Sequence, residues 1–211
     1  GGYPLSRQTL ARIQVDLLNE GAMGVGYVIA FPQPDRFGGD AQFAEALSYG
    51  PSVLAMFEND NGEYPPTTGT VILGDDVGGI NVKGVIQNIE ILKQNANQGI
   101  AVARPEIDSL VRRLPLLMRT PDGWVPAFGT EVLKILAEAD TYIINTSDNG
   151  LSEIRVKGLN PVPVDPLGRK WISFVNTPQT DLAEMDVAGK FVFVGFTAKG
   201  IMPQLSTPAG L

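Results

Sequence analysis

Helical and strand-like hydrophobic patterns alternate along the first part of the chain. Apolar residues recur at helical spacing over residues 10–18, where Ser6 provides a suitable N-cap and Gly21 a suitable end. Residues 24–31 follow as a short apolar run rich in β-branched and aromatic side chains. Such a run is typical of a strand that is buried on both faces. The pattern therefore predicts a helix followed by a buried strand.

The same alternation continues in the next segment. Residues 41–49 again have helical spacing, and Asp40 precedes them as the predicted N-cap. Residues 53–57 form a second apolar run that predicts another buried strand, and the polar residues 58–69 predict a surface loop. A helix between two buried strands predicts a βαβ unit, in which the two strands run parallel.

The rest of the chain predicts one strong helix and several short strands. The helix covers residues 126–139, with Pro126 at its start where the missing N–H has no cost. A weaker helical pattern covers residues 86–92. Short strands are predicted at residues 71–73, 100–103, 114–118, 142–145, 154–156, 171–175 and 191–195. Residues 191–194 are apolar throughout, which predicts a central place in the sheet.

These elements predict a single α/β domain over residues 1–211, with a central, mostly parallel or mixed β-sheet and helices packed on its faces. The chain contains no repeat, no low-complexity tract and no linker of the kind that separates domains. It stops at Leu211 directly after a Thr-Pro-Ala-Gly turn, so we expect a fragment of a longer protein.

The amino-acid composition restricts the classes of protein to which this chain can belong. With 44% apolar and 18% charged residues the chain belongs with folded globular proteins. A net charge of -7 and the lack of a basic run disfavour nucleic-acid binding. The longest apolar stretch, residues 21–31, has about half the length that a membrane helix needs, so we expect that the chain as given does not span a membrane.

The complete absence of Cys and His is the strongest restriction on chemistry. It excludes Ser-His-Asp and Cys-His sites, thiolate nucleophiles and zinc sites built from His and Cys. The acidic stretches at Asp75-Asp76 and at residues 58–63 lack the ligand spacing of a calcium loop. We therefore expect no metal, no cofactor and no enzymatic activity in this domain.

A series of short motifs runs through the whole chain. The motifs are Gly2-Tyr3-Pro4-Leu5-Ser6-Arg7, Gly21-Ala22, residues 25–31 with Pro34-Asp35 and Gly39-Asp40, Val111-Arg112-Arg113-Leu114-Pro115-Leu116-Leu117, Pro126-Ala127-Phe128, residues 172–175, residues 189–198 and Thr207-Pro208. In order and spacing this series resembles the CHASE2 domain, the extracytoplasmic sensor module of bacterial membrane-bound signalling proteins.

The resemblance implies a larger architecture. Proteins with this domain typically have one membrane helix before it and several after it, which lead to a cytoplasmic cyclase, kinase, phosphatase or diguanylate cyclase. The resemblance implies a periplasmic location at the inner membrane, with membrane contact only through helices absent from this fragment. It also implies a homodimeric receptor, and a small molecule or protein as the signal. Two departures concern acidic positions that are common in the family, because this chain has Val28 and Met202-Pro203 there. A binding site built on that acidic pair is therefore not carried over.

Ligands of open α/β sheets bind at the carboxyl ends of parallel strands, and two loops follow such strands here. They cover residues 34–40 and 196–200. The candidate ligand-binding residues in these loops are Asp35, Arg36, Asp40, Thr197 and Lys199. Arg36 and Lys199 suit an anionic group. The competing interpretation is that Asp40 only caps a helix and Asp35 only forms a turn.

Arg113 is a further candidate ligand-binding residue. Its neighbour Arg112 would point to the opposite face of a strand, so at most one of the two enters a pocket. A salt bridge or a solvated face is the commoner use of such a pair. The leading hypothesis is a sensor domain, with a ligand-free dimerisation module as the alternative and a hydrolase-like or phosphotransfer enzyme as a third possibility.

Overall fold

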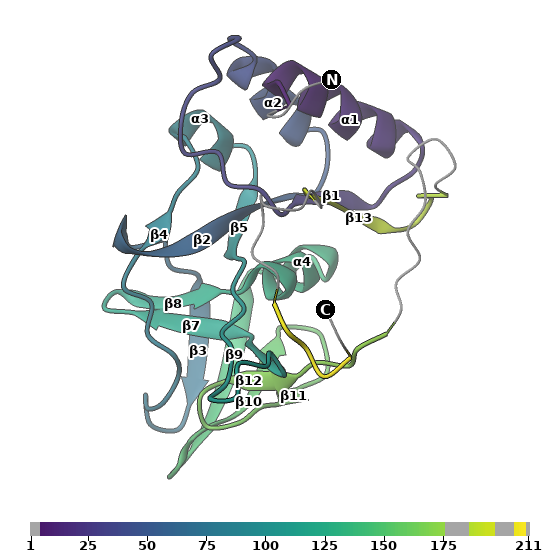
Figure 1. The fold of residues 1–211 in the computed structure, drawn as a ribbon. Coiled ribbons are helices and arrows are strands. Elements are labelled where there is room, and N and C mark those ends of the chain that lie inside the picture. The colour runs from purple at the N-terminus through teal and green to yellow at the C-terminus, as the bar shows by residue number, and fades with distance from the viewer. Residues whose placement is uncertain (1–4, 176–185, 197–204, 210–211) are drawn as a thin grey trace.

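The structure is a computed structural model that describes residues 5–175, 186–196 and 205–209. Three helices cover one face of a five-stranded sheet and a fourth helix packs on its other face (Figure 1). The three helices are α1 (Arg7–Asn19), α2 (Asp40–Leu47) and α3 (Glu90–Lys93), and the fourth is α4 (Phe128–Leu136). The predicted mixed α/β fold is confirmed.

The five-stranded sheet is mostly parallel. It consists of β13 (Phe191–Val194), β1 (Gly24–Tyr27), β2 (Ser52–Glu63), β4 (Val85–Ile86) and β5 (Asn97–Ile100). Strand β1 pairs in parallel with β13 on one side and with β2 on the other, and β5 pairs in parallel with β2. The predicted parallel βαβ unit is therefore confirmed, and only β4 runs antiparallel.

The prediction of a central place for residues 191–194 is wrong, since β13 is the last strand in the order β13-β1-β2-β4. Val192 is buried, but the side chain of Phe193 is 56% exposed. Phe193 lies 5.9 Å from the ring of Phe128 and 5.5 Å from that of Phe191, both measured between centroids. Residues 191–194 are therefore apolar because their aromatic side chains pack against Phe128 of α4, and not because the strand is central in the sheet.

Beyond α4 lies a second set of strands (Figure 1). A four-stranded sheet has the order β11-β10-β9-β3, and two two-stranded sheets accompany it. The strands of the larger sheet are β3 (Gly69–Leu73), β9 (Thr141–Ser147), β10 (Gly150–Val156) and β11 (Val162–Pro163). The smaller sheets pair β7 (Leu117–Thr120) with β8 (Gly123–Pro126), and β6 (Arg113–Pro115) with β12 (Arg169–Trp171).

Several element predictions differ from the structure. The expected loop at 58–69 is partly strand, because β2 continues to Glu63 and pairs with Val85 across a register shift. Strand β4 also takes Ile86 out of the helix expected at 86–92, of which only α3 remains. The strands expected at 24–31, 100–103 and 171–175 end early, at Tyr27, Ile100 and Trp171. In each case pairing with a distant segment decided the local conformation.

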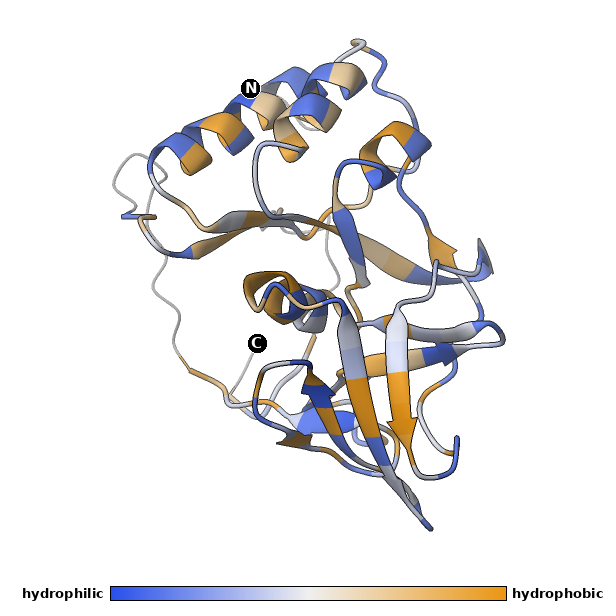
Figure 2. Cartoon of the chain, turned by 180° about the vertical axis from the view of Figure 1, so that it is seen from behind, coloured by the Kyte–Doolittle hydropathy of each residue, from blue (hydrophilic) through white to orange (hydrophobic). Residues whose placement is uncertain are grey.

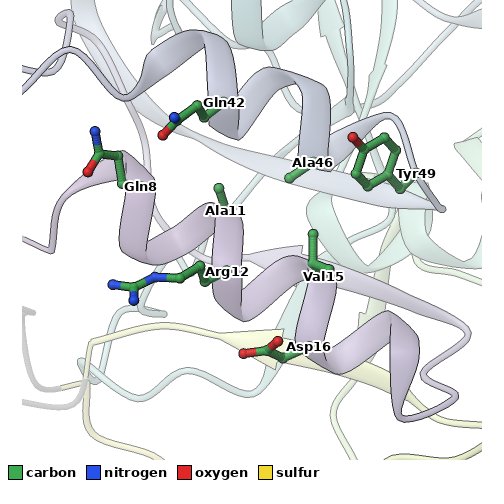
Figure 3. Close-up of a pocket in the computed structure, with 8 residues that line it drawn as sticks. All are labelled: Gln8, Ala11, Arg12, Val15, Asp16, Gln42, Ala46 and Tyr49. Atoms are coloured by element: carbon green, nitrogen blue, oxygen red, sulfur yellow. The ribbon is translucent and has the colours of Figure 1, made fainter.

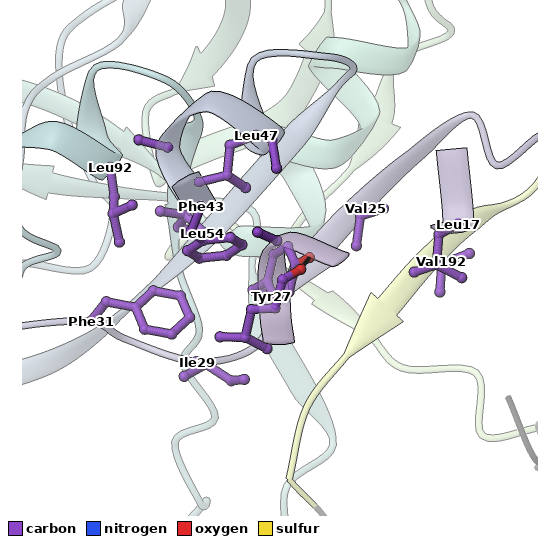
Figure 4. Packing of buried hydrophobic residues seen from close by; sticks show 14 of the residues in the cluster. Leu17, Val25, Tyr27, Ile29, Phe31, Phe43, Leu47, Leu54, Leu92 and Val192 are labelled. Carbon is purple, nitrogen blue, oxygen red and sulfur yellow. Dashed lines mark hydrogen bonds between the residues drawn. The ribbon is translucent and has the colours of Figure 1, made fainter. Parts of the chain in front are cut away.

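The core between the sheet and helices α1 to α3 is aromatic at its centre (Figure 4). Tyr27, Phe31 and Phe43 meet edge to face, with the Phe43 ring centroid 5.1 Å from that of Tyr27 and 5.4 Å from that of Phe31. The buried Tyr27 hydroxyl donates to Gln14 Oε1 at 3.0 Å, and Gln14 Nε2 donates to Ser52 Oγ at 2.9 Å. This network ties α1 to the sheet without leaving these polar groups unsatisfied.

A buried carboxylate joins α4 to the strands on either side of it. Glu131 is 3% exposed and accepts hydrogen bonds from Asn97 Nδ2 at 2.9 Å and from the Tyr142 hydroxyl at 2.8 Å. Lys134 Nζ lies 2.9 Å from the Glu131 carboxylate. Burial raises the pKa of Tyr142, and the neighbouring charge of Glu131 raises it further. Tyr142 therefore stays protonated and serves as a donor.

Candidate functional site

A cavity of about 430 Å³ opens at the carboxyl end of β1. Because β1 and β13 are neighbouring parallel strands, the segments that follow them emerge at the same edge of the sheet. Phe31, from the segment after β1, and Phe196, two residues after the end of β13, both line the cavity. Leu5 and Leu10 line it from the start of the chain and from α1. The cavity thus lies at the carboxyl ends of the parallel strands, where the sequence predicted the candidate ligand-binding loops.

The polar part of the wall is an interlocked group of charged side chains. Asp35 accepts hydrogen bonds from the backbone N–H of Arg7 at 3.0 Å, of Phe37 at 3.2 Å and of Gly39 at 3.3 Å. The backbone N–H of Asp35 in turn donates to Asp40 Oδ2 at 2.7 Å. Partial burial raises the pKa of Asp35, but the three backbone donors together outweigh it and leave that pKa below its usual value. Asp35 is thus an ionised turn former.

Asp40 is not the N-cap of α2, contrary to the sequence prediction. Gly39 occupies the N-cap position, and Asp40 is the first helical residue. Its carboxylate turns back toward Asp35 and lies 3.4 Å from Arg7 Nε. The segment that enters α2 is thereby fixed to the start of α1 through Arg7, whose guanidinium carbon stands 4.3 Å from the ring centroid of Phe31. Burial lowers the pKa of Arg7, and the charges of Asp40 and Asp35 oppose that shift.

Arg36 is different, because its side chain lines the cavity and remains exposed. Its guanidinium carbon lies 4.7 Å from the ring centroid of Phe37, and it forms no ion pair with any residue in the described ranges. The charge of Arg7 is balanced by two carboxylates, whereas the charge of Arg36 is available to a ligand. Thr197 and Lys199 lie outside the described residues.

Sequence reasoning missed Asn88, which holds the cavity wall in place. This buried side chain accepts a hydrogen bond from the backbone N–H of Phe31 at 2.7 Å. Its amide donates to the Ala55 carbonyl at 3.1 Å and to Gln98 Oε1 at 2.9 Å. One side chain therefore connects the segment after β1 to β2 and β5. The sequence around Asn88 mixes polar and apolar residues, so nothing in it marks Asn88 as a buried residue.

Arg113 is not brought to this site. On β6 its Nε donates to Glu106 at 2.7 Å and its Nη1 donates to Asp165 at 2.8 Å. Its neighbour Arg112 also reaches Glu106, at 3.5 Å, so the two side chains share a partner instead of pointing to opposite faces. The side-chain hydrogen bond from Arg113 lowers the pKa of Glu106. The salt-bridge interpretation of Arg112 and Arg113 is confirmed.

A second cavity, of about 550 Å³, is a groove between α1 and α2 on the outside of the helical layer (Figure 3). Ala11 and Ala46 leave room between the helices, while Arg12, Asp16 and Gln42 provide a polar rim. It lies away from the strand ends, and its rim consists of freely solvated side chains. We regard the strand-end cavity as the better candidate because it lies at the carboxyl ends of parallel strands, where ligands of open α/β sheets bind, and because Leu and Phe side chains form its apolar walls.

No helix in the described part of the chain is long and apolar enough to cross a membrane. Over the same residues, no group of three or more carboxylates is arranged so that it could hold a metal ion.

The profile of the CHASE2 domain family matches residues 1–210. The chain belongs to the CHASE2 domain family. Comparisons with curated proteins and with solved structures found no significant match. CHASE2 domains are extracytoplasmic sensor domains involved in signal transduction and are not catalytic domains, so this CHASE2 domain is a sensor domain.

Proposed function

We propose that this CHASE2 domain senses a small molecule that binds in the strand-end cavity, as the periplasmic part of a bacterial transmembrane receptor at the inner membrane. The receptor would pass the signal to a cytoplasmic output domain such as an adenylate cyclase, a diguanylate cyclase or a kinase. The observation that carries the proposal is the cavity of about 430 Å³ between β1 and α1, with the exposed Arg36 in its wall.

The lining suggests the chemistry of the ligand. Leu5, Leu10 and Phe31 are apolar walls, which favour an apolar body. Arg36 is a cation with five donors, and it forms no ion pair with any residue of the described ranges, because the neighbouring Asp35 accepts from backbone N–H groups instead. Such a cation favours a carboxylate or phosphate. A small organic acid is therefore the class of ligand that we propose.

The connection from the cavity to α1 supports a signalling role. Arg7 lines the cavity and is the first residue of α1, and its backbone N–H is held by Asp35. A ligand that binds one arrangement of this contact more tightly than another would shift the position of α1. In receptors of the usual CHASE2 architecture the first membrane helix precedes this helix, so such a shift would reach the membrane.

The test is a thermal-shift screen of the chain against small carboxylic acids and phosphorylated metabolites, since a ligand bound only by the folded state raises the melting temperature. A saturable shift that is lost in Arg36→Ala and retained in Arg12→Ala supports binding at the strand ends. Arg12 is a matched control because it is an exposed arginine of the other cavity. A shift lost in Arg12→Ala alone, or no shift with any acid, contradicts the proposal.

A further inference from the structure

The outer edge of β3 is an open strand edge with an apolar, uncharged sequence. Within the described ranges β3 pairs with β9 only, so its second edge belongs to no ladder. Its five residues are Gly-Thr-Val-Ile-Leu, and Figure 2 shows the strand coloured as apolar from its middle to its end. Natural sheets usually protect such an edge with a charge, a proline or a bulge, and β3 contains none of these.

Apolar side chains are exposed beside this edge. Val71 is 47% exposed and Leu73 is 51% exposed, and both lie on the outer face of the sheet. The register of the sheet places Ile143 of β9 next to Val71, and Arg155 of β10 next to Ile143. An apolar stripe therefore leads across the sheet to its open edge and begins at a charged residue.

We propose that two copies of this chain pair through their β3 edges, antiparallel and centred on Val71. The two four-stranded sheets then form one continuous sheet of eight strands across a twofold axis. The outer stripe becomes Arg155, Ile143 and Val71 from one copy, followed by the same residues of the other copy in reverse order. The apolar residues meet in the middle and both arginines remain at the ends.

The sequence of β3 is complementary to itself in this register. Leu73 of one copy comes to lie opposite Gly69 of the other, so a large exposed side chain meets a residue that has none. The acidic pair Asp75-Asp76 follows the turn at Gly74, just beyond the end of β3, so the antiparallel arrangement places the two copies of this pair at opposite ends of the paired strands. A parallel, in-register arrangement would instead bring both acidic pairs to the same end. For a chain with a net charge of -7, this favours the antiparallel pair.

The chain has no cysteine, so single cysteines report on this contact without interference. In the proposed register the two copies of residue 71 face each other. The two copies of residue 73 stand four residues apart along the strands, about 13 Å at the rise of a β-strand. Disulfide formation needs Cα atoms within about 7 Å. We therefore expect Val71→Cys to cross-link on mild oxidation about tenfold more than Leu73→Cys.

Ile107→Cys serves as a control for random collision, because Ile107 is fully exposed and lies outside β3. All three variants change exposed side chains, and equal thermal midpoints under reducing conditions check that the fold is retained. Equal cross-linking of the three variants, a preference for Leu73→Cys, or no cross-linked dimer of Val71→Cys overturns the proposal. The contact involves no residue of the strand-end cavity, so its failure would leave the proposed ligand binding unaffected, and the reverse also holds.

Discussion

Asn88 provides the sharpest test of how the cavity wall is held. Asn88→Ala removes the acceptor of the Phe31 backbone N–H and the donor to both the Ala55 carbonyl and Gln98. A buried N–H left without a partner costs about 1–3 kcal/mol, and each of the two lost donor bonds about 0.5–1.5 kcal/mol. The free energy of unfolding should therefore fall by about 3 kcal/mol.

The assay is urea unfolding followed by circular dichroism, with the free energy of unfolding extrapolated to zero urea. Asn95→Ala is the matched control, because Asn95 donates only to the Ile91 carbonyl one turn earlier on an exposed surface. We expect the control to lose less than about 0.5 kcal/mol. If Asn88→Ala loses no more than Asn95→Ala, then Asn88 does not support Phe31, and the explanation of the cavity wall is wrong.

Three further outcomes are expected. Phe43→Ala should lower the free energy of unfolding by about 3–5 kcal/mol, whereas Phe37→Ala, which changes an exposed side chain, should change it by less than about 0.5 kcal/mol, both from urea unfolding. Tyr142→Phe removes a donor from the buried Glu131 carboxylate and should cost about 1.5–3 kcal/mol; an unchanged urea midpoint would contradict the role of Glu131 as a link between layers. Asp35 has a folded-state pKa below its usual value, so it stabilises the fold above its unfolded pKa and loses this effect as the pH falls through the folded pKa. Urea midpoints measured from neutral pH to below about pH 4 should therefore fall less steeply for Asp35→Asn than for the unmodified chain, and identical slopes would refute this.

The local sequence pattern predicted the elements whose conformation is decided by neighbouring residues. Ser6 caps α1 as predicted, and its side chain accepts from the Thr9 N–H at 3.2 Å. The strong helical pattern of residues 126–139 corresponds to α4, and the parallel βαβ unit follows from residues 24–57. These signals depend on spacing within a few residues, which the sequence contains directly.

The candidate site was predictable only in part. That the loop after β1 would border a cavity followed from the general geometry of parallel sheets. The sequence did not predict which residue of that loop is structural and which is available to a ligand, because Asp35 and Arg36 are adjacent and both charged. Contacts with Arg7 and Asp40 make Asp35 structural and leave Arg36 exposed at the cavity. Such contacts depend on how α1 and α2 are placed on the sheet.

The sequence by itself determined the class of fold, the main helices, the family, and the exclusion of His and Cys chemistry. Only the tertiary structure decided which strand lies at an edge, since β13 and a central strand have the same apolar composition and differ only in their neighbours. It also decided the role of Asn88, whose partners are 57, 33 and 10 residues away along the chain. The periodicity of a sequence predicts which side chains face the core. The hydrogen-bond partners of a buried side chain and the position of a strand in its sheet depend instead on which distant segments of the chain pack beside it.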